Sequence, residues 1–107
     1  MDNISVIIRN HNEQDYIGFS IQSVIDNFNN PEIIIIDNNS IDDSLGIINM
    51  FIPHNNIKIF NIKKYSPGSS LNLGVSKCVN DNILILSAHS QITKMNYSLV
   101  KHKLENN

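Results

Sequence analysis

The sequence predicts a single α/β domain in which a parallel sheet carries helices on both faces. Three observations lead to this fold class: four short runs rich in Ile and Val, segments with helical spacing of apolar residues between them, and strict alternation of the two kinds. Continuous apolar runs are typical of strands buried on both faces. The βαβαβαβ order therefore predicts a parallel, doubly wound sheet.

The four expected strands are β-branched or apolar runs separated by polar segments. They cover Ile4–Ile8, Ile33–Ile36, Ile57–Ile62 and Ile83–Leu86. The third run alternates apolar and polar residues, whereas the second and fourth are continuous. Strands of this length fit the sheet of a small domain.

Three helices are expected between the strands, each with one apolar face. The faces consist of Ile17, Ile21, Val24 and Phe28; Leu45, Ile48 and Phe51 or Ile52; and Leu71, Val75, Cys78 and Val79. Ser40 and Asp43 lie three residues apart and resemble a capping box that would start the second helix. A fourth helix, with weaker periodicity, is expected over Thr93–Glu105.

Composition limits the class of protein. The chain has 107 residues, 41% hydrophobic and 17% charged, with a formal net charge of −2, which fits one ordinary domain over residues 1–107. No basic stripe indicates a nucleic-acid partner, and no apolar run is long enough for a transmembrane segment. Cys78 is the only cysteine, so a reducing compartment fits. We expect a cytoplasmic protein, either free or peripheral to the inner face of the membrane.

Polar segments follow all four expected strands. Ligands of open α/β sheets bind beyond the carboxyl ends of the strands, so these segments should meet at one edge. The segments are Arg9–Glu13, Asp37–Ser40, Lys63–Ser70 and Ser87–Ser90. They contain neither GxGxxG nor GxxxxGK[ST], which argues against a dinucleotide-binding fold and a P-loop NTPase. The sequence thus places His89 at the mouth of a cleft.

Several of these polar residues fit either a structural or a functional role when only their chemistry and position are considered. Asp37 either accepts a hydrogen bond from a nucleobase or ribose, or caps the next helix. From the residues alone, Glu13 fits a first-turn helix acid better than a binding residue. His89 is either a neutral hydrogen-bonding residue or a metal ligand, although no second histidine lies at ligand spacing. Gly74 interrupts a helical pattern, which indicates close approach by a ligand or by a neighbouring strand.

Three segments resemble the family 2 glycosyltransferases of the GT-A fold. SVIIRNHNE (Ser5–Glu13) resembles their first strand and loop, and EIIIIDNNSIDDS (Glu32–Ser44) resembles their second strand. Tyr65–Ser90 resembles the Asn- and Gly-containing helix and the strand that carries the DxD motif. The resemblance covers residues 4–92 and implies a Rossmann-like GT-A domain.

The resemblance implies a site for a nucleotide-sugar donor. Arg9, His11, Glu13 and Asp37 would hold the nucleoside; Gly68, Asn72 and Gly74 would border the diphosphate and sugar; and Ser87 and His89 would occupy the DxD position. The DxD motif binds Mg²⁺ or Mn²⁺. Here the motif reads SAH, which leaves two alternatives. Either His89 helps to hold the cation as a metal ligand, or His89 or a lysine faces the diphosphate directly.

By resemblance, the chain would transfer a sugar from a nucleotide-diphosphate sugar to a saccharide or lipid-linked acceptor, in bacterial surface polysaccharide synthesis. The acceptor half of the family, with its catalytic base, has no counterpart before residue 107. We therefore expect a domain that is incomplete at its C-terminus, and no catalytic residue is assigned. The alternative is a non-catalytic nucleotide-binding fragment or remnant. A response-regulator-like domain with Asp37 as phosphoacceptor ranks last, because Glu13 is the only acid after the first strand.

Overall fold

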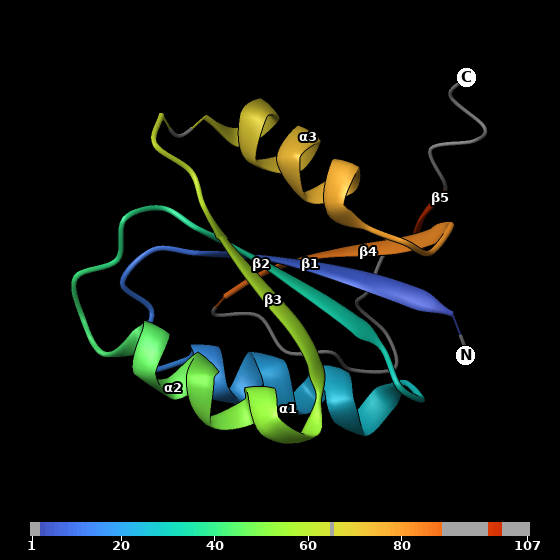
Figure 1. Cartoon of the computed structure of the whole chain (residues 1–107), viewed down its shortest axis with the longest axis horizontal. Helices are drawn as coiled ribbons and strands as arrows, with labels where there is room; N and C mark the ends of the chain where they lie inside the picture. The colour runs from blue at the N-terminus through green and yellow to red at the C-terminus, as the bar shows by residue number, and fades with distance from the viewer. Residues whose placement is uncertain (1–2, 65, 89–98, 102–107) are drawn as a thin grey trace.

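The computed structural model describes residues 3–64, 66–88 and 99–101, and its centre is a five-stranded sheet with the order β3-β2-β1-β4-β5 (Figure 1). The strands are β1 (Ile4–Asn10), β2 (Glu32–Asp37), β3 (Asn56–Asn61), β4 (Asn82–Ser87) and β5 (Leu99–Lys101). The first four pair in parallel, which confirms the predicted parallel α/β fold.

Helices cover both faces of the sheet, as expected. The helix α1 (Ile17–Asn27) and the helix α2 (Ser44–Phe51) lie on one face, and α3 (Pro67–Lys77) lies on the other (Figure 1). A 3₁₀ turn, η1 (Ile52–His54), leads from α2 into β3. Within the described ranges, no helix has the length and apolar character needed to cross a membrane.

The core consists of two apolar layers separated by the sheet. Alternate side chains of each strand enter opposite layers, because successive residues of a strand point to opposite faces. Val6 and Ile8 of β1 pack with Ile21 and Val24 of α1, whereas Ile7 belongs to the layer under α3. All residues of β2 are buried, which agrees with the continuous apolar run predicted for a central strand.

The helix α3 approaches the sheet through small side chains. Ser70, Gly74 and Cys78 are buried, whereas Val79 is 70% exposed. A Cβ atom added to Gly74 would lie 2.8 Å from Cγ2 of Ile7, so the glycine permits close contact with β1. The sequence predicted that either a ligand or a neighbouring strand approaches Gly74 closely, and the approach of a neighbouring strand is thus confirmed. The assignment of Val79 to the apolar face is wrong, because α3 ends at Lys77.

Two predicted features differ from the structure. Residues Leu99–Lys101 fall within the expected fourth helix, but they form β5, which pairs antiparallel with β4. The edge of β4 offers unpaired backbone groups, and this pairing outweighs the weak helical periodicity. The predicted capping box at Ser40 is also wrong, because Ser40 is held by Asp37 and α2 begins only at Ser44. A capping box instead joins Ser66 and Ser69 at the start of α3.

A buried carboxylate links neighbouring strands near their amino ends, opposite the end of the sheet that carries the predicted site. Glu32 is 1% exposed, and its Oε1 accepts hydrogen bonds from Ser5 Oγ at 2.7 Å and from the Val79 N–H at 2.9 Å. Its Oε2 lies 3.2 Å from Nζ of Lys58. Burial acts to raise the pKa of Glu32, but these three donors outweigh it and hold the pKa below its usual value of 4.5.

Candidate functional site

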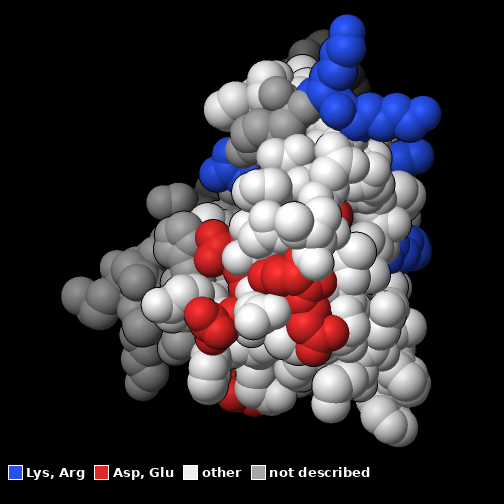
Figure 2. Space-filling view, turned by 90° about the vertical axis from the view of Figure 1, so that its left-hand side faces the viewer, with Lys and Arg blue, Asp and Glu red and all other residues white. Residues whose placement is uncertain are grey.

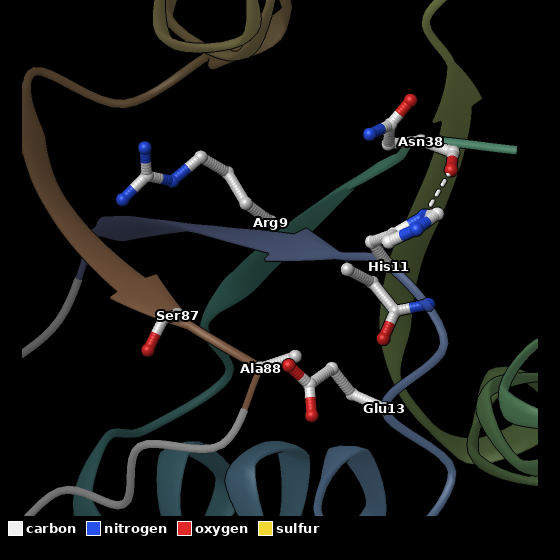
Figure 3. A pocket seen from close by; sticks show the side chains of 7 residues that line it. Arg9, His11, Glu13, Asn38, Ser87 and Ala88 are labelled. Carbon is white, nitrogen blue, oxygen red and sulfur yellow. Dashed lines mark hydrogen bonds between the residues drawn. The ribbon is translucent and has the colours of Figure 1, made fainter. Parts of the chain in front are cut away.

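The candidate site is a hollow at the carboxyl ends of β1, β2 and β4. It lies where the strand order reverses, since β1 pairs with β2 on one side and with β4 on the other. Open α/β sheets bind their ligands at this kind of position. The hollow has a volume of about 270 Å³ (Figure 3). It is lined by Arg9, Asn10, His11, Glu13, Asn38, Ser87 and Ala88.

The floor of the hollow depends on a buried amide at the end of β1. Asn10 is 1% exposed, and its Nδ2 lies 2.9 Å from Asp37 Oδ1, 3.1 Å from Ser40 Oγ and 3.0 Å from Ser44 Oγ. Both serine hydroxyls donate elsewhere, to Asp37 and to Asp42 respectively, so toward Asn10 they can only accept. All three neighbours therefore require a donor. This fixes the amide with its NH₂ group toward Asp37 and its oxygen on the other side.

The loops after β1 and β2 are held against each other by further hydrogen bonds. Asn12 adopts a left-handed backbone conformation (φ 51°), and its Oδ1 accepts from the N–H groups of Ile41 and Asp42 at 2.7 and 3.2 Å.

Asp42 also links the two loops. Partial burial acts to raise the pKa of Asp42. However, hydrogen bonds from Ser44 and from the Gln14 N–H lower it below its usual value of 3.8. The two loops thus form one hydrogen-bonded unit.

His11 is positioned by the backbone of the neighbouring loop. Its Nδ1 lies 2.5 Å from the carbonyl oxygen of Asn38. A carbonyl only accepts, so Nδ1 carries the proton and Nε2 is the acceptor of the neutral ring. His11 is exposed, and Figure 3 shows it beside Asn38 at the rim of the hollow.

Two buried polar atoms at this site have no hydrogen-bond partner among the described residues. They are Nε of Arg9 and Oδ1 of Asn10, one donor and one acceptor. Leaving such an atom unpaired costs about 1–3 kcal/mol, so native structures rarely keep one without a reason. Both belong to residues that line the hollow, where a bound water or a polar ligand would supply the missing partner.

The structure brings together four of the predicted site residues. Arg9, His11, Glu13 and Ser87 line the hollow. Asp37 lies beneath it, 2% exposed, with its carboxylate accepting hydrogen bonds from Asn10 and Ser40. Two of the predicted residues, Gly68 and Asn72, lie exposed on α3 and are not among the lining residues, and His89 lies outside the described residues.

Three further residues line the hollow, namely Asn10, Asn38 and Ala88. They lie in the segments that the sequence predicts to converge there, but none was predicted individually as a site residue. Their only signal in the sequence is their position directly after, or at the end of, an apolar run. Ala88 is fixed from two sides: its N–H donates to the Arg9 carbonyl at 3.1 Å, and its own carbonyl accepts from Ser20 Oγ of α1.

The donors near the hollow do not form a metal site within the part of the chain that the structure describes. No group of three His, Cys, Asp or Glu side chains there is close enough to hold a metal ion. Glu13 is the only carboxylate among the lining residues, and Ser87 stands at the first position of the DxD-like segment. We therefore derive no chemical step through a cation.

Acidic and basic side chains lie on different parts of this face of the molecule. Figure 2 faces the carboxyl ends of the strands, with acidic side chains gathered on its lower part and basic side chains on its upper part. The loops after β1 and β2 carry the acids Glu13, Asp15, Asp42 and Asp43. The loop after β3, on the side of α3, carries Lys63 and Lys64. An anionic ligand is therefore favoured on the α3 side of the site.

Comparison with solved structures shows the same fold. The first 349 residues of S. aureus TarS superpose with a TM-score of 0.78 at 23% identity, over 86% of this chain and 29% of the TarS chain. The same TarS fragment in complex with UDP-GlcNAc gives 0.77 at 24% identity, over 86% and 28%. A mannosyltransferase of Pyrobaculum calidifontis in complex with GDP-Man and Mn²⁺ gives 0.75 at 14% identity, over 83% and 28%.

Sequence comparison identifies the family. The minor teichoic acid biosynthesis protein GgaA of Bacillus subtilis (strain 168) is 37% identical over 78 residues, which is 67% of this chain and 18% of GgaA. The chain thus spans less than a third of each of these proteins. The model of glycosyl transferase family 2 matches residues 5–107. The chain accordingly belongs to glycosyl transferase family 2, as the resemblance of its three segments predicts.

Proposed function

We propose that the hollow binds the nucleotide part of a nucleotide-diphosphate sugar, as the donor site of a glycosyl transfer reaction. The observation that carries the proposal is the hollow at the switch point between β1 and β4. Two of its lining residues, Arg9 and Asn10, each bury a polar atom that has no partner among the described residues. The family match supports the reaction class. The complex of TarS with UDP-GlcNAc supports a UDP-linked sugar as the donor.

The proposal extends to the acceptor of the sugar. The relative GgaA is named for teichoic acid biosynthesis, which supports a saccharide or lipid-linked acceptor in the synthesis of a cell-surface polymer. Transfer requires a base that takes the proton of the acceptor hydroxyl while the diphosphate leaves. We assign only donor binding to the described residues, and we name no catalytic base among them.

In this proposal, different lining residues contact different parts of the donor. His11 and Asn38 lie at the rim, where a planar base could lie against the imidazole ring and hydrogen-bond to the side-chain amide. Asn10 offers its buried Oδ1 as an acceptor at the floor. Asp37 acts in this proposal as a positioning residue, because it orients the Asn10 amide rather than facing the hollow.

Calorimetric titration of the chain with UDP, GDP, CDP and dTDP tests the proposal. We expect UDP to bind most tightly. His11→Ala should weaken binding by about fivefold or more, as expected for the loss of roughly 1 kcal/mol of contact with the base. His54→Ala is the matched control, since His54 lies in η1 and does not line the hollow. Absence of binding by all four nucleotides at about 1 mM, by a chain shown to be folded, would refute the proposed function.

A further inference from the structure

Arg9 emerges from the sheet on the face that α3 covers. It follows Ile7 by two residues on β1, and Ile7 packs under α3, so both side chains point to the same face. Its register partners are Ser87 on β4 and Ile36 on β2. Figure 3 shows the guanidinium extending toward α3, on the side of β1 away from Glu13.

Among the described residues, no acidic side chain forms an ion pair with the guanidinium group of Arg9. In residues 3–64 and 66–88, the ion pair found is that of Lys58 with Glu32, at the opposite edge of the sheet. Nε of Arg9 is buried and lacks a hydrogen-bond partner in the same ranges. Arginine presents a planar fork of donors that matches phosphate oxygens. A half-buried arginine with an unused donor at the wall of a hollow is therefore suited to an anionic ligand.

The charges around Arg9 favour an anion at the same place. The acids of this end of the molecule lie in the loops that lead into α1 and α2, whereas Lys63 and Lys64 lie in the loop that leads from β3 into α3. Figure 2 shows basic side chains on the upper part of this face and acidic side chains on its lower part. The register partner of Arg9 on β4 is Ser87, a neutral hydroxyl rather than a carboxylate. On β2 the register partner is Ile36, and the carboxylate of the next residue, Asp37, accepts hydrogen bonds from Asn10 and Ser40. Among the described residues, no ion pair with a carboxylate competes with an anion for the guanidinium.

We propose that the guanidinium of Arg9 binds the diphosphate of the donor, while the rim at His11 and Asn38 binds the base. The inference rests on the proposed function, because it takes the ligand to be a nucleoside diphosphate. It changes the role expected for Arg9 from the sequence, where the whole loop Arg9–Glu13 was assigned to the nucleoside. The donor then lies across the end of β1, from the rim toward the α3 side.

Comparison of UDP with uridine separates the two parts of the ligand. Binding of both to the wild-type chain and to Arg9→Gln is measured by calorimetry, once with EDTA and once with Mn²⁺. We expect Arg9→Gln to weaken UDP binding by about ten- to a hundredfold, the effect of losing charge-assisted hydrogen bonds, and to change uridine binding by less than about twofold. Arg9→Lys should give an intermediate loss for UDP, because it keeps the charge and loses the fork.

A matched control removes a basic side chain from the same side of the molecule. Lys63→Gln lies in the loop after β3 and does not line the hollow, so its effect on UDP binding should stay below about threefold. An unchanged ratio of UDP to uridine affinity in Arg9→Gln, with UDP still bound by the wild type, would overturn this inference and leave the proposed function intact. Failure of the folded wild type to bind either ligand would overturn both.

Discussion

At the scale of single residues, the site depends on polar side chains that serve the structure rather than the ligand. Asp37 accepts hydrogen bonds from Asn10 Nδ2 at 2.9 Å, from Ser40 Oγ at 2.6 Å and from the Ser40 N–H at 2.9 Å. Both of its oxygens are thus used within the protein. The sequence alone left helix capping and ligand binding open for Asp37, and the contacts in the structure give it a third role, the orientation of Asn10.

Replacement of Asp37 by Asn tests this role. One oxygen becomes an NH₂ group, which must face either the Asn10 and Ser40 side-chain donors or the Ser40 N–H. We therefore expect Asp37→Asn to lower the free energy of unfolding by about 2 kcal/mol, the cost of an unsatisfied buried donor. Urea denaturation gives the value.

The control for that substitution is Asp26→Asn on α1. Asp26 is exposed and accepts a hydrogen bond only from the Gln22 side chain among the described residues, so its replacement should change stability by less than about 0.5 kcal/mol. Equal effects of the two substitutions would contradict the positioning role of Asp37.

At the scale of secondary-structure elements, the sequence predicted the strands better than the helix ends. Short apolar runs rich in isoleucine identify β1, β2 and β4, because buried parallel strands need apolar side chains on both faces. The helix α3 was harder to interpret, since its fully buried residues are Ser70 and Gly74, whereas its larger apolar side chains are only partly buried. Two small residues at i and i+4 give little periodic signal.

The close contact of α3 with β1 predicts opposite effects at two glycines of the same helix. A Cβ atom at Gly74 would lie 2.8 Å from Ile7 Cγ2, whereas a Cβ atom at Gly68 would meet nothing within 4 Å. Gly74→Ala should therefore destabilise the chain by about 1–3 kcal/mol through overpacking. Gly68→Ala should be neutral, or stabilising by up to about 1 kcal/mol through helix propensity. Thermal or urea unfolding of both variants checks the pair, and a stabilised Gly74→Ala variant would contradict the packing described.

At the scale of the whole molecule, the two edges of the sheet have different roles. The carboxyl edge carries the hollow, and the opposite edge carries the buried Glu32 with Ser5, Lys58 and Val79. Neither network could be predicted in detail from the sequence. The partners of Glu32 lie 26 to 47 residues from it in the sequence, and those of Asn10 lie 27 to 34 residues from it, so the contacts arise only when the sheet forms.

The Glu32 network predicts how stability depends on pH. Because the pKa of Glu32 is lower in the folded chain than its usual 4.5, its contribution is fully present above about pH 4.5. The contribution is lost as the pH falls through the lower native pKa. Glu32→Gln should lower the free energy of unfolding by about 2 kcal/mol at pH 7, and the difference from wild type should shrink toward about pH 3.

Urea denaturation of both proteins across this pH range gives the comparison. Lys58→Gln is the control, since the Lys58 side chain is 48% exposed and its ion pair should contribute less than about 1 kcal/mol. A difference between wild type and Glu32→Gln that stays constant with pH would contradict the assignment.

The central claim is that the hollow at the switch point binds a nucleoside diphosphate. Two-dimensional ¹H–¹⁵N NMR of the wild-type chain during titration with UDP tests it most directly, because each backbone amide reports its own surroundings. We predict the largest shifts at Arg9, His11, Asn38 and Ser87, and small shifts at Val79 and Asn80 on the opposite edge. A dispersed spectrum without shifts, or with its largest shifts at the opposite edge, would contradict the claim.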